Sequence, residues 1–358
     1  MGCDGLVHLI LAISVVVAFS KTKYTNKSLF PFSVLILTTF AVLRYQYGND
    51  YNSYFRSYLS IRNGGYNPFE DEILFSFLNN IIPSYYFLVA IISIFYLLVI
   101  SNLIKKNMQG IYAGLGMLIF VINPYLFLMN LSAMRQCIAM CIFVVAIKYL
   151  YERRLIKYML LILLATGFHT SALILIPVYF FINGKQMNKI QTVVLITGVL
   201  ILMFESAFVS QMIEIGLNFF DNSDYTHHFS QDMQNSLRAT ILTGVSFTYV
   251  VINLTNLKGY RLVCGKLYLI GLLFGLLAYY YSMFTRVQMY FDIFSIVALP
   301  AIIEYHICNT RTKWARVVQV YLFPCAILSI YLARYYTFFT NPMWKSFGMY
   351  HTIFEAIL

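Results

Sequence analysis

Three arginines lie in the first turn of apolar segments, a position that suits anion binding. They are Arg135 in LSAMRQ, Arg238 in NSLRAT and Arg286 in MFTRVQ. Free backbone N–H groups at a helix N-terminus and a guanidinium can bind the same oxygens of a phosphate or carboxylate. The helix dipole disfavours a cation there, so we predict that Arg135 and Arg286, which are flanked by apolar sequence, serve an anion. For Arg238 and Arg334, contact of the side chain with the lipid headgroups is at least as good an explanation as anion binding.

His169, in GFHTSA, is the candidate for proton transfer. It lies between two apolar stretches, and imidazole titrates near neutral pH, so it can act as an acid, a base or a phosphate donor. A core histidine hydrogen-bonded by Thr170 or Ser171 is the structural alternative. Carboxylates predicted on the same side of the membrane, each alone more often a solvated loop residue, are Asp50, Asp221, Asp224 and Asp232.

Four tyrosines, Tyr47, Tyr51, Tyr54 and Tyr58, follow one another at spacings of 4, 3 and 4 residues. These spacings place them on one face of a helix. Such a face is typical of an aromatic anchor at the membrane interface. Tyrosine rings also stack on sugars, and Asp50 lies beside them, so Tyr51 is also a candidate for substrate binding.

Motifs for several other chemistries are missing from the sequence. It contains no Cys-x-x-Cys pair, glycine-rich phosphate loop or nucleophile elbow. His227 and His228 are adjacent and have no ligand partners at a suitable spacing. We therefore predict neither a metal ion nor another cofactor. The net charge of +11 follows the loops between apolar segments, so we expect no nucleic acid as a partner.

The elements that must position these residues are membrane helices. Hydrophobic residues make up 60% of the 358 residues and charged residues 11%, which is typical of a polytopic membrane protein. Apolar runs fall near residues 5–20, 29–45, 84–104, 110–130, 133–151, 156–168, 170–183, 190–209, 238–256, 266–284, 287–305 and 316–333. We predict an all-α protein with about twelve membrane segments, forming one membrane domain over residues 1–358.

Lysine and arginine are distributed differently over the loops. Twelve of the thirteen lysines lie on the side that the positive-inside rule assigns to the cytoplasm, whereas seven of the twelve arginines lie on the other side. This excess of arginine indicates an outer site for phosphate or carboxylate. The predicted outer elements are the loops 46–83 and 210–237 and the tail 334–358. One tilted span over 156–183 is possible, but two half-spanning helices that meet at GFHTSA keep the flanking basic loops on one side.

Four stretches carry a resemblance to a known family. They are RYQYGNDYNSYFRSY at 44–58, the segment 130–181 that contains MRQCIA and GFHTSAL, FTRVQMYFDIFSIVALPAII at 284–303, and NPMWKSFGMYHTIF at 341–354. In order, spacing and membrane position they resemble the EpsG-like branch of Wzy-type polysaccharide polymerases. The residues that match the family pattern are Arg44, Asp50, Arg135, Gln136, His169, Arg286 and Tyr290. The match is weaker over 184–260.

The resemblance implies a glycosyl transfer on the outer face of a bacterial cytoplasmic (inner) membrane, by a helical body similar to GT-C glycosyltransferases. A growing glycan on undecaprenyl pyrophosphate would move to a lipid-linked repeat unit, without a metal. Arg135 and Arg286 would hold developing charge, and Asp50 or His169 would be the base. The substrate-binding residues would be Arg44, Tyr51, Gln136, Arg238, Tyr290 and Asp232. Membrane lipids and a chain-length regulator are expected partners.

Two other functions would use similar groups. A flippase or transporter of the lipid-linked repeat unit also needs cations in a membrane cavity, but internal repeats and cations on both sides of the midplane are then expected. An O-antigen ligase has the same leaving group and a lipid A core acceptor. A membrane-bound acyltransferase would need a motif around its histidine that this sequence lacks. The matching stretches favour the polymerase.

Overall fold

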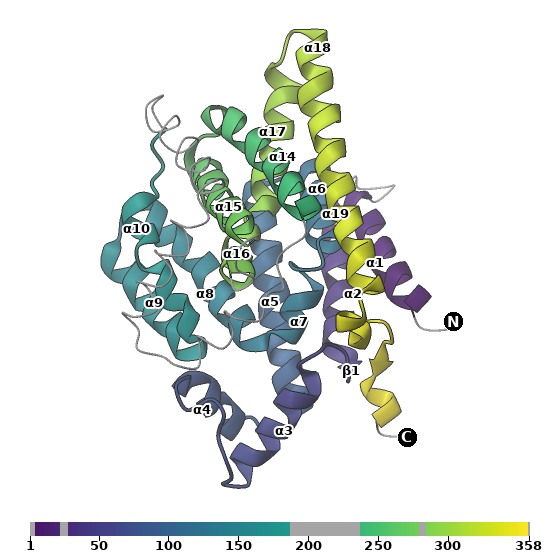
Figure 1. Ribbon diagram of the computed structural model, residues 1–358, viewed down its shortest axis with the longest axis vertical. Coiled ribbons are helices and arrows are strands. Elements are labelled where there is room, and N and C mark those ends of the chain that lie inside the picture. The colour runs from purple at the N-terminus through teal and green to yellow at the C-terminus, as the bar shows by residue number, and fades with distance from the viewer. Residues whose placement is uncertain (1–3, 22–27, 187–236, 279–283, 357–358) are drawn as a thin grey trace. The chain divides into compact units, whose positions relative to one another are not determined.

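The computed structural model describes residues 4–21, 28–186, 237–278 and 284–356 (Figure 1). The described chain is helical almost throughout, which confirms the all-α prediction. It divides into two compact units, one made of residues 1–183 and 328–358 and the other of residues 184–327. That the whole chain acts as a single membrane domain stays a prediction.

Helices that are long and apolar enough to cross a membrane are fewer than the sequence predicts. Four qualify within the described ranges: α5 (Tyr85–Asn107), α8 (Met134–Tyr151), α15 (Gly259–Leu277) and the continuous run Lys313–Thr340. A fifth is possible if α16 (Phe284–Asp292) and α17 (Ser295–Asn309), which are bent by 50°, count as one span. The other predicted segments that are described form shorter helices, and the predicted segment 190–209 lies outside the described residues. A helix of 14 residues is only about 21 Å long, against a hydrocarbon thickness of about 30 Å, so length alone does not make them spans.

The first unit is a bundle around α5 and α8. Its helices, besides these two, are α1 (Asp4–Phe19), α2 (Phe30–Leu43), α3 (Tyr51–Arg62), α4 (Ile73–Ile81), α6 (Ile111–Ile122), α7 (Leu128–Ser132), α9 (Leu155–Phe168), the 3₁₀ helix η1 (Thr170–Leu175) and α10 (Val178–Phe181). α2 and α8 both pack on α5, and α1 packs on α2 and α6. Because α8 is apolar on nearly every side, most of its side chains are buried.

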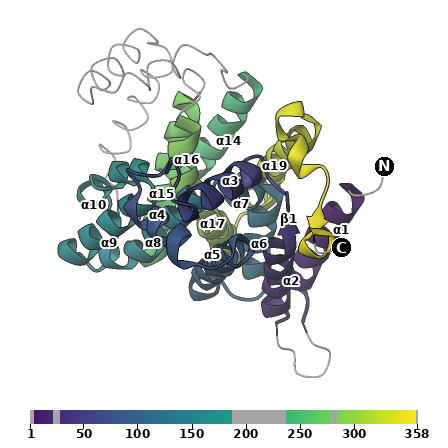
Figure 2. The same ribbon diagram turned by 90° about the horizontal axis from the view of Figure 1, so that it is seen from below.

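The chain breaks and turns back at His169. α9 ends at Phe168, and His169 has an extended backbone (φ −156°, ψ 115°). The hydroxyl of Tyr158 donates to the Leu175 carbonyl at 2.6 Å, and Nη1 of Arg153 donates to the Ile182 carbonyl at 3.0 Å. The second half therefore runs back along the first, as predicted for two half-spanning helices. Figure 2 shows α8, α9 and α10 side by side.

The loop 46–83 folds into α3 and α4, which pack against each other, and α4 also packs on α9. Tyr51, Tyr54 and Tyr58 share one face of α3, as predicted, but Tyr47 precedes the helix. All four rings are buried, and Tyr51 meets the Tyr85 ring edge-on with the centroids 5.2 Å apart. This face is therefore packed inside the unit, and the interpretation as an exposed interfacial anchor is wrong, because periodicity does not tell which partner covers a face.

The tail is fixed to the segment that precedes α3. It contains η4 (Pro342–Phe347), strand β2 (His351–Thr352) and η5 (Ile353–Ala356). β2 pairs antiparallel with β1 (Arg44–Tyr45), with Arg44 opposite Thr352. The Tyr350 ring stacks on Phe40 at 4.4 Å, and its hydroxyl donates to the Phe40 carbonyl at 2.6 Å. The tail thus holds the residues that lead into α3.

The second unit contains α14 (Leu237–Asn253), η2 (Leu254–Asn256), α15, α16 and α17, followed by α18 (Lys313–Arg316) and the π-helix η3 (Val317–Leu322). α19 (Phe323–Thr340) begins in this unit and ends in the first. α15 and α16 approach closely at glycines: a Cβ on Gly271 would lie 2.9 Å from the Cβ of Phe291, and one on Gly275 would lie 2.9 Å from Nε2 of Gln288. Small residues allow this close helix packing.

Candidate active site

Arg135 is the second residue of α8, which confirms its predicted place in the first turn. Its Nη1 donates to Oε2 of Glu72 at 2.6 Å, and its Nε donates to the Tyr54 hydroxyl oxygen at 3.1 Å. The guanidinium also lies over the Phe69 ring, 4.7 Å from the centroid. Its side chain keeps 30% of its surface exposed, so these contacts orient the guanidinium without enclosing it.

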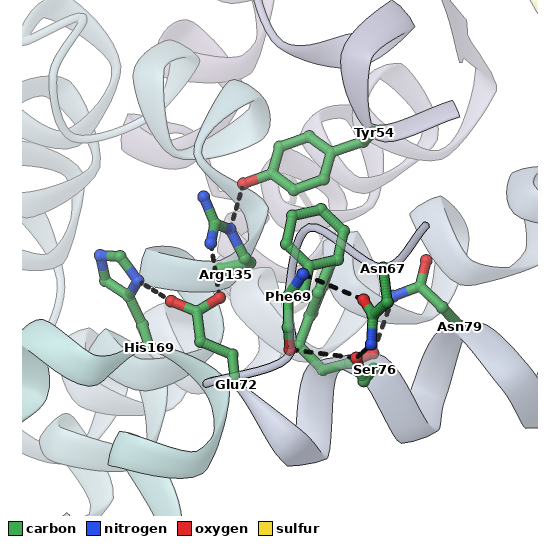
Figure 3. Close-up of polar contacts among 9 residues, drawn as sticks. Tyr54, Asn67, Phe69, Glu72, Ser76, Asn79, Arg135 and His169 are labelled. Carbon is green, nitrogen blue, oxygen red and sulfur yellow. Dashed lines mark hydrogen bonds and ion pairs between the residues drawn. The ribbon is translucent and has the colours of Figure 1, made fainter. Parts of the chain in front are cut away.

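His169 reaches the same carboxylate from the break between α9 and η1. Its Nδ1 lies 2.6 Å from Oε1 of Glu72 (Figure 3). The imidazole is 16% exposed, whereas the Glu72 side chain is 5% exposed. Two residues that the sequence singled out separately, Arg135 and His169, are therefore joined by a third, Glu72, one on each carboxylate oxygen.

Glu72 is the residue that the sequence analysis missed. It stands immediately before α4, and a compact turn places it there. Nδ2 of Asn67 donates to Oγ of Ser76 at 2.6 Å, the Phe69 amide donates to Oδ1 of Asn67 at 2.9 Å, and Ser76 Oγ donates to the Phe69 carbonyl at 3.1 Å (Figure 3). The available signal was an acid directly before an apolar helix in FEDEILFSF, where solvated Glu70 and Asp71 obscure it.

The electrostatics keep this cluster charged. Burial by itself would raise the pKa of Glu72, but the hydrogen bond with His169, the positive charge of Arg135, the charge of His169 when it is protonated, and the Arg135 hydrogen bond together bring that pKa below its usual range. Burial raises the pKa of Tyr54, and Arg135 opposes this rise only in part. Glu72 is therefore an anion and Tyr54 a neutral phenol near neutral pH.

Two nitrogens of the cluster remain available for a ligand. Within the described residues, Nη2 of Arg135 and Nε2 of His169 make no hydrogen bond. Because the ionised carboxylate can only accept, Nδ1 of His169 carries a proton. Whenever the ring is neutral, Nε2 then has a free lone pair. The cluster offers a guanidinium edge for an anion and an imidazole nitrogen for a proton.

Asp50 is brought to the start of α8 through Ser132. The Asp50 amide donates to Oγ of Ser132 at 3.0 Å, and that hydroxyl donates to Oδ2 of Asp50 at 3.1 Å. The chain comes this close because Gly48 has φ +107° and a Cβ there would lie 3.3 Å from the Ser132 Cβ. Asn49 is bound by the tail: its Nδ2 donates to the Met343 carbonyl at 2.8 Å. Asp50 is half-buried, and its role as a base stays a prediction.

Three predicted substrate-binding residues of the first unit are buried. Arg44 is 1% exposed. Its Nη1 donates to the Ala41 carbonyl and, at 2.6 Å, to Oγ of Ser93, while Nη2 donates to the Leu131 carbonyl at 3.1 Å. It thus connects α2, α5 and α7. Tyr51 and Gln136 are also buried. Substrate contacts by these residues stay predictions.

Arg286 and Tyr290 belong to the second unit. Arg286 lies in the first turn of α16, as predicted, and Tyr290 is buried on the same helix. Deeper on α16, Oδ2 of Asp292 accepts from Nε2 of Gln288 at 2.8 Å. The joint action of these residues with Arg135 stays a prediction.

Two further predicted residues are described only in part or not at all. Arg238 is the second residue of α14, which confirms its position in a first turn, but its side chain lies outside the described part. Asp232, like Asp221 and Asp224, lies outside the described residues. In the ranges that the structure describes, no three His, Cys, Asp or Glu residues are grouped so that they could hold a metal ion.

The comparison with protein families matches the EpsG family over residues 27–351. No curated protein and no solved structure matches the chain significantly. The matched range contains Arg44, Asp50, Glu72, Arg135 and His169. It also covers the tail as far as His351, the first residue of β2. Because the match extends over nine-tenths of its length, this chain belongs to the EpsG family.

Proposed function

We propose that this protein is a Wzy-type O-antigen or exopolysaccharide polymerase. It transfers a glycan from undecaprenyl pyrophosphate to a lipid-linked repeat unit. Membership of the EpsG family, a polysaccharide-polymerase-like membrane family, supports this reaction class. The single observation that carries the proposal is that Arg135 and His169 of this family member meet on the Glu72 carboxylate, at 2.6 Å each.

The reaction needs a stabilised leaving group and a base. The acceptor hydroxyl oxygen attacks the anomeric carbon, the bond from that carbon to the pyrophosphate oxygen breaks, and the electron pair leaves with undecaprenyl pyrophosphate. Arg135 holds the negative charge that develops, a role in which one fixed donor is worth about 10²–10³ in rate. Arg286 is the second residue predicted for this role, and Arg238 stays a predicted substrate-binding residue. Guanidinium groups rather than a metal ion supply the positive charge. The proton of the acceptor goes to His169 or Asp50.

The proposed setting is the bacterial cytoplasmic membrane with the site facing outward. The lysine distribution supports this orientation. With the shorter apolar helices, α14 and the predicted segment 190–209, which lies outside the described residues, the proposed total is about twelve membrane segments in one GT-C-like body, some only half-spanning as at His169. The loop 46–83, which supplies Glu72, and the tail lie on the outer face. A chain-length regulator and membrane lipids are the proposed partners.

The proposal is tested by deletion and complementation in the native strain. Surface glycan is resolved on a gel after complementation with the wild type, Arg135→Ala, His169→Ala or Arg56→Ala at matched expression. Arg56 is the control because it is an exposed arginine of the loop 46–83 whose Nε bonds only the Asn52 carbonyl. We expect the deletion to reduce a ladder to single repeat units, with rescue by the wild type and Arg56→Ala only.

The alternative functions, a flippase and a ligase, predict other results in the same experiment. Complete loss of surface glycan with accumulation of lipid-linked repeat units indicates a flippase. Free polymer on its lipid carrier that is no longer joined to a lipid A core indicates a ligase. Either result would exclude the polymerase.

A further inference from the structure

We propose that Glu72 is a positioning residue that holds His169 as the Nδ1–H tautomer and leaves Nε2 open, which makes His169 rather than Asp50 the base. This role rests on the polymerase function proposed above. Glu72 itself does not touch the reacting atoms. It acts through His169 and, on its other oxygen, through Arg135.

The contact geometry supports the tautomer. Nδ1 of His169 and Oε1 of Glu72 are 2.6 Å apart, and Oε2 of Glu72 is 2.6 Å from Nη1 of Arg135. Both oxygens of a carboxylate accept, so both neighbours donate. A neutral imidazole that donates from Nδ1 has its lone pair on Nε2. That nitrogen takes the proton when the acceptor oxygen attacks the anomeric carbon.

Asp50 is held for a different purpose. Its amide and one carboxylate oxygen both bond the Ser132 hydroxyl, at 3.0 and 3.1 Å. Asn49, next to it, bonds the Met343 carbonyl of the tail. These contacts fix the turn before α3 and its distance from α8. Asp50 therefore has a structural role in this turn.

The arrangement predicts an unusual effect of an isosteric change. In Glu72→Gln, one of the two carboxylate oxygens becomes an NH₂ group. Arg135 has only donors, so the amide oxygen must face it, and the NH₂ group must face His169. Nδ1 of His169 then has to accept, and the ring changes to the Nε2–H tautomer. The guanidinium keeps its contact while the base is lost.

Nitrogen NMR tests the tautomer without any assay of activity. The protein is labelled with ¹⁵N-histidine in lipid bilayers at pH about 8.5, about two units above the usual titration of imidazole. The chain has 6 histidines, and a His169→Gln spectrum identifies the signals of His169. We expect a protonated Nδ1 and a bare Nε2 in the wild type, and the reverse in Glu72→Gln. Glu70→Gln, an exposed carboxylate of the same stretch, should match the wild type.

Kinetics test what the tautomer does. With purified protein and lipid-linked repeat units, Glu72→Gln should lower kcat by about 10²–10⁴, as expected when a base is held in the wrong tautomer, with KM little changed. Glu72→Ala should also raise KM, because Arg135 loses its orientation. Glu70→Gln should have wild-type kinetics.

The outcomes separate this role from the function on which it rests. A bare Nδ1 or a doubly protonated ring in the wild type would overturn the positioning role, as would equal kcat in the wild type and Glu72→Gln. If the wild type elongates repeat units in those cases, the polymerase stands. If the wild type elongates nothing while NMR shows the expected tautomers, the polymerase fails and Glu72 still sets the state of His169.

Discussion

Replacing Arg135 by lysine separates the charge of this side chain from its shape. The ammonium can keep the ion pair with Glu72 but cannot also bond the Tyr54 hydroxyl and place a planar group over the Phe69 ring. Loss of the Tyr54 bond costs about 1–3 kcal/mol, and loss of the stacking about 0.5–1 kcal/mol. Because Arg135 is 30% exposed, solvent screening places the summed destabilisation near the low end of these ranges, about 1.4 kcal/mol. This corresponds to a tenfold change in the equilibrium by which α3 opens.

The effect on catalysis should be larger, because lysine has a single ammonium group and cannot donate to Glu72 and also replace Nη2 as a donor to the substrate. We expect kcat/KM to fall by about 10²–10³, the usual cost of one lost donor to a developing anion. Elongation of lipid-linked repeat units measures this fall, and hydrogen exchange of residues 51–62 measures the opening of α3. Arg56→Lys, a change at an exposed arginine of α3, is the control. If Arg135→Lys is as active as the control, the guanidinium does not need to contact Glu72 and Tyr54 and donate from Nη2 at the same time, and the reasoning is refuted.

Three further predictions concern the parts that support the site. Ser132→Ala removes both bonds to Asp50 and should raise hydrogen exchange over residues 48–54 by about 30-fold, since each bond contributes about 1 kcal/mol. The folded pKa of Glu72 is lowered, so the stability that this carboxylate adds is full above its unfolded pKa of about 4.3 and is lost as pH falls through the lower folded value. Exchange of residues 73–81 should therefore accelerate below pH 4, but not in Glu72→Gln. Gly271→Ala forces a contact at 2.9 Å on α16 and should destabilise the protein by about 1–3 kcal/mol, measured by thermal unfolding, whereas Gly244→Ala, with nothing within 4 Å, should not.

Part of the candidate site could be predicted because it depends on local sequence. Arg135 and Arg286 fall in the first turn of a helix because each begins an apolar run, and the break at His169 follows from the two short apolar halves around it. Glu72 could not be predicted, because its partners are 63 and 97 residues away along the chain. The one signal in FEDEILFSF, an acid directly before an apolar run, is obscured by the two exposed acids that precede it.

The tyrosines of α3 also show which features depend on local sequence and which depend on distant segments. A spacing of three and four residues determines that Tyr51, Tyr54 and Tyr58 share a face, but burial depends on Tyr85, Ile82 and Phe75, which come from other elements. An amphipathic pattern has the same form whether lipid, sugar or protein covers it. The interpretation of this face as an anchor at the membrane interface was therefore wrong, because the face packs against protein.

What the sequence by itself determined is the membrane class, the helical content and the position of the cationic residues at helix starts. Hydrophobic content and periodicity are properties of short windows, so they need no knowledge of the fold. The tertiary structure alone decided that Glu72 joins Arg135 to His169, that Arg44 is enclosed, and that the tail pairs with β1. Such contacts arise when distant segments pack, because a buried charge is stable only where packing supplies its hydrogen-bond partners.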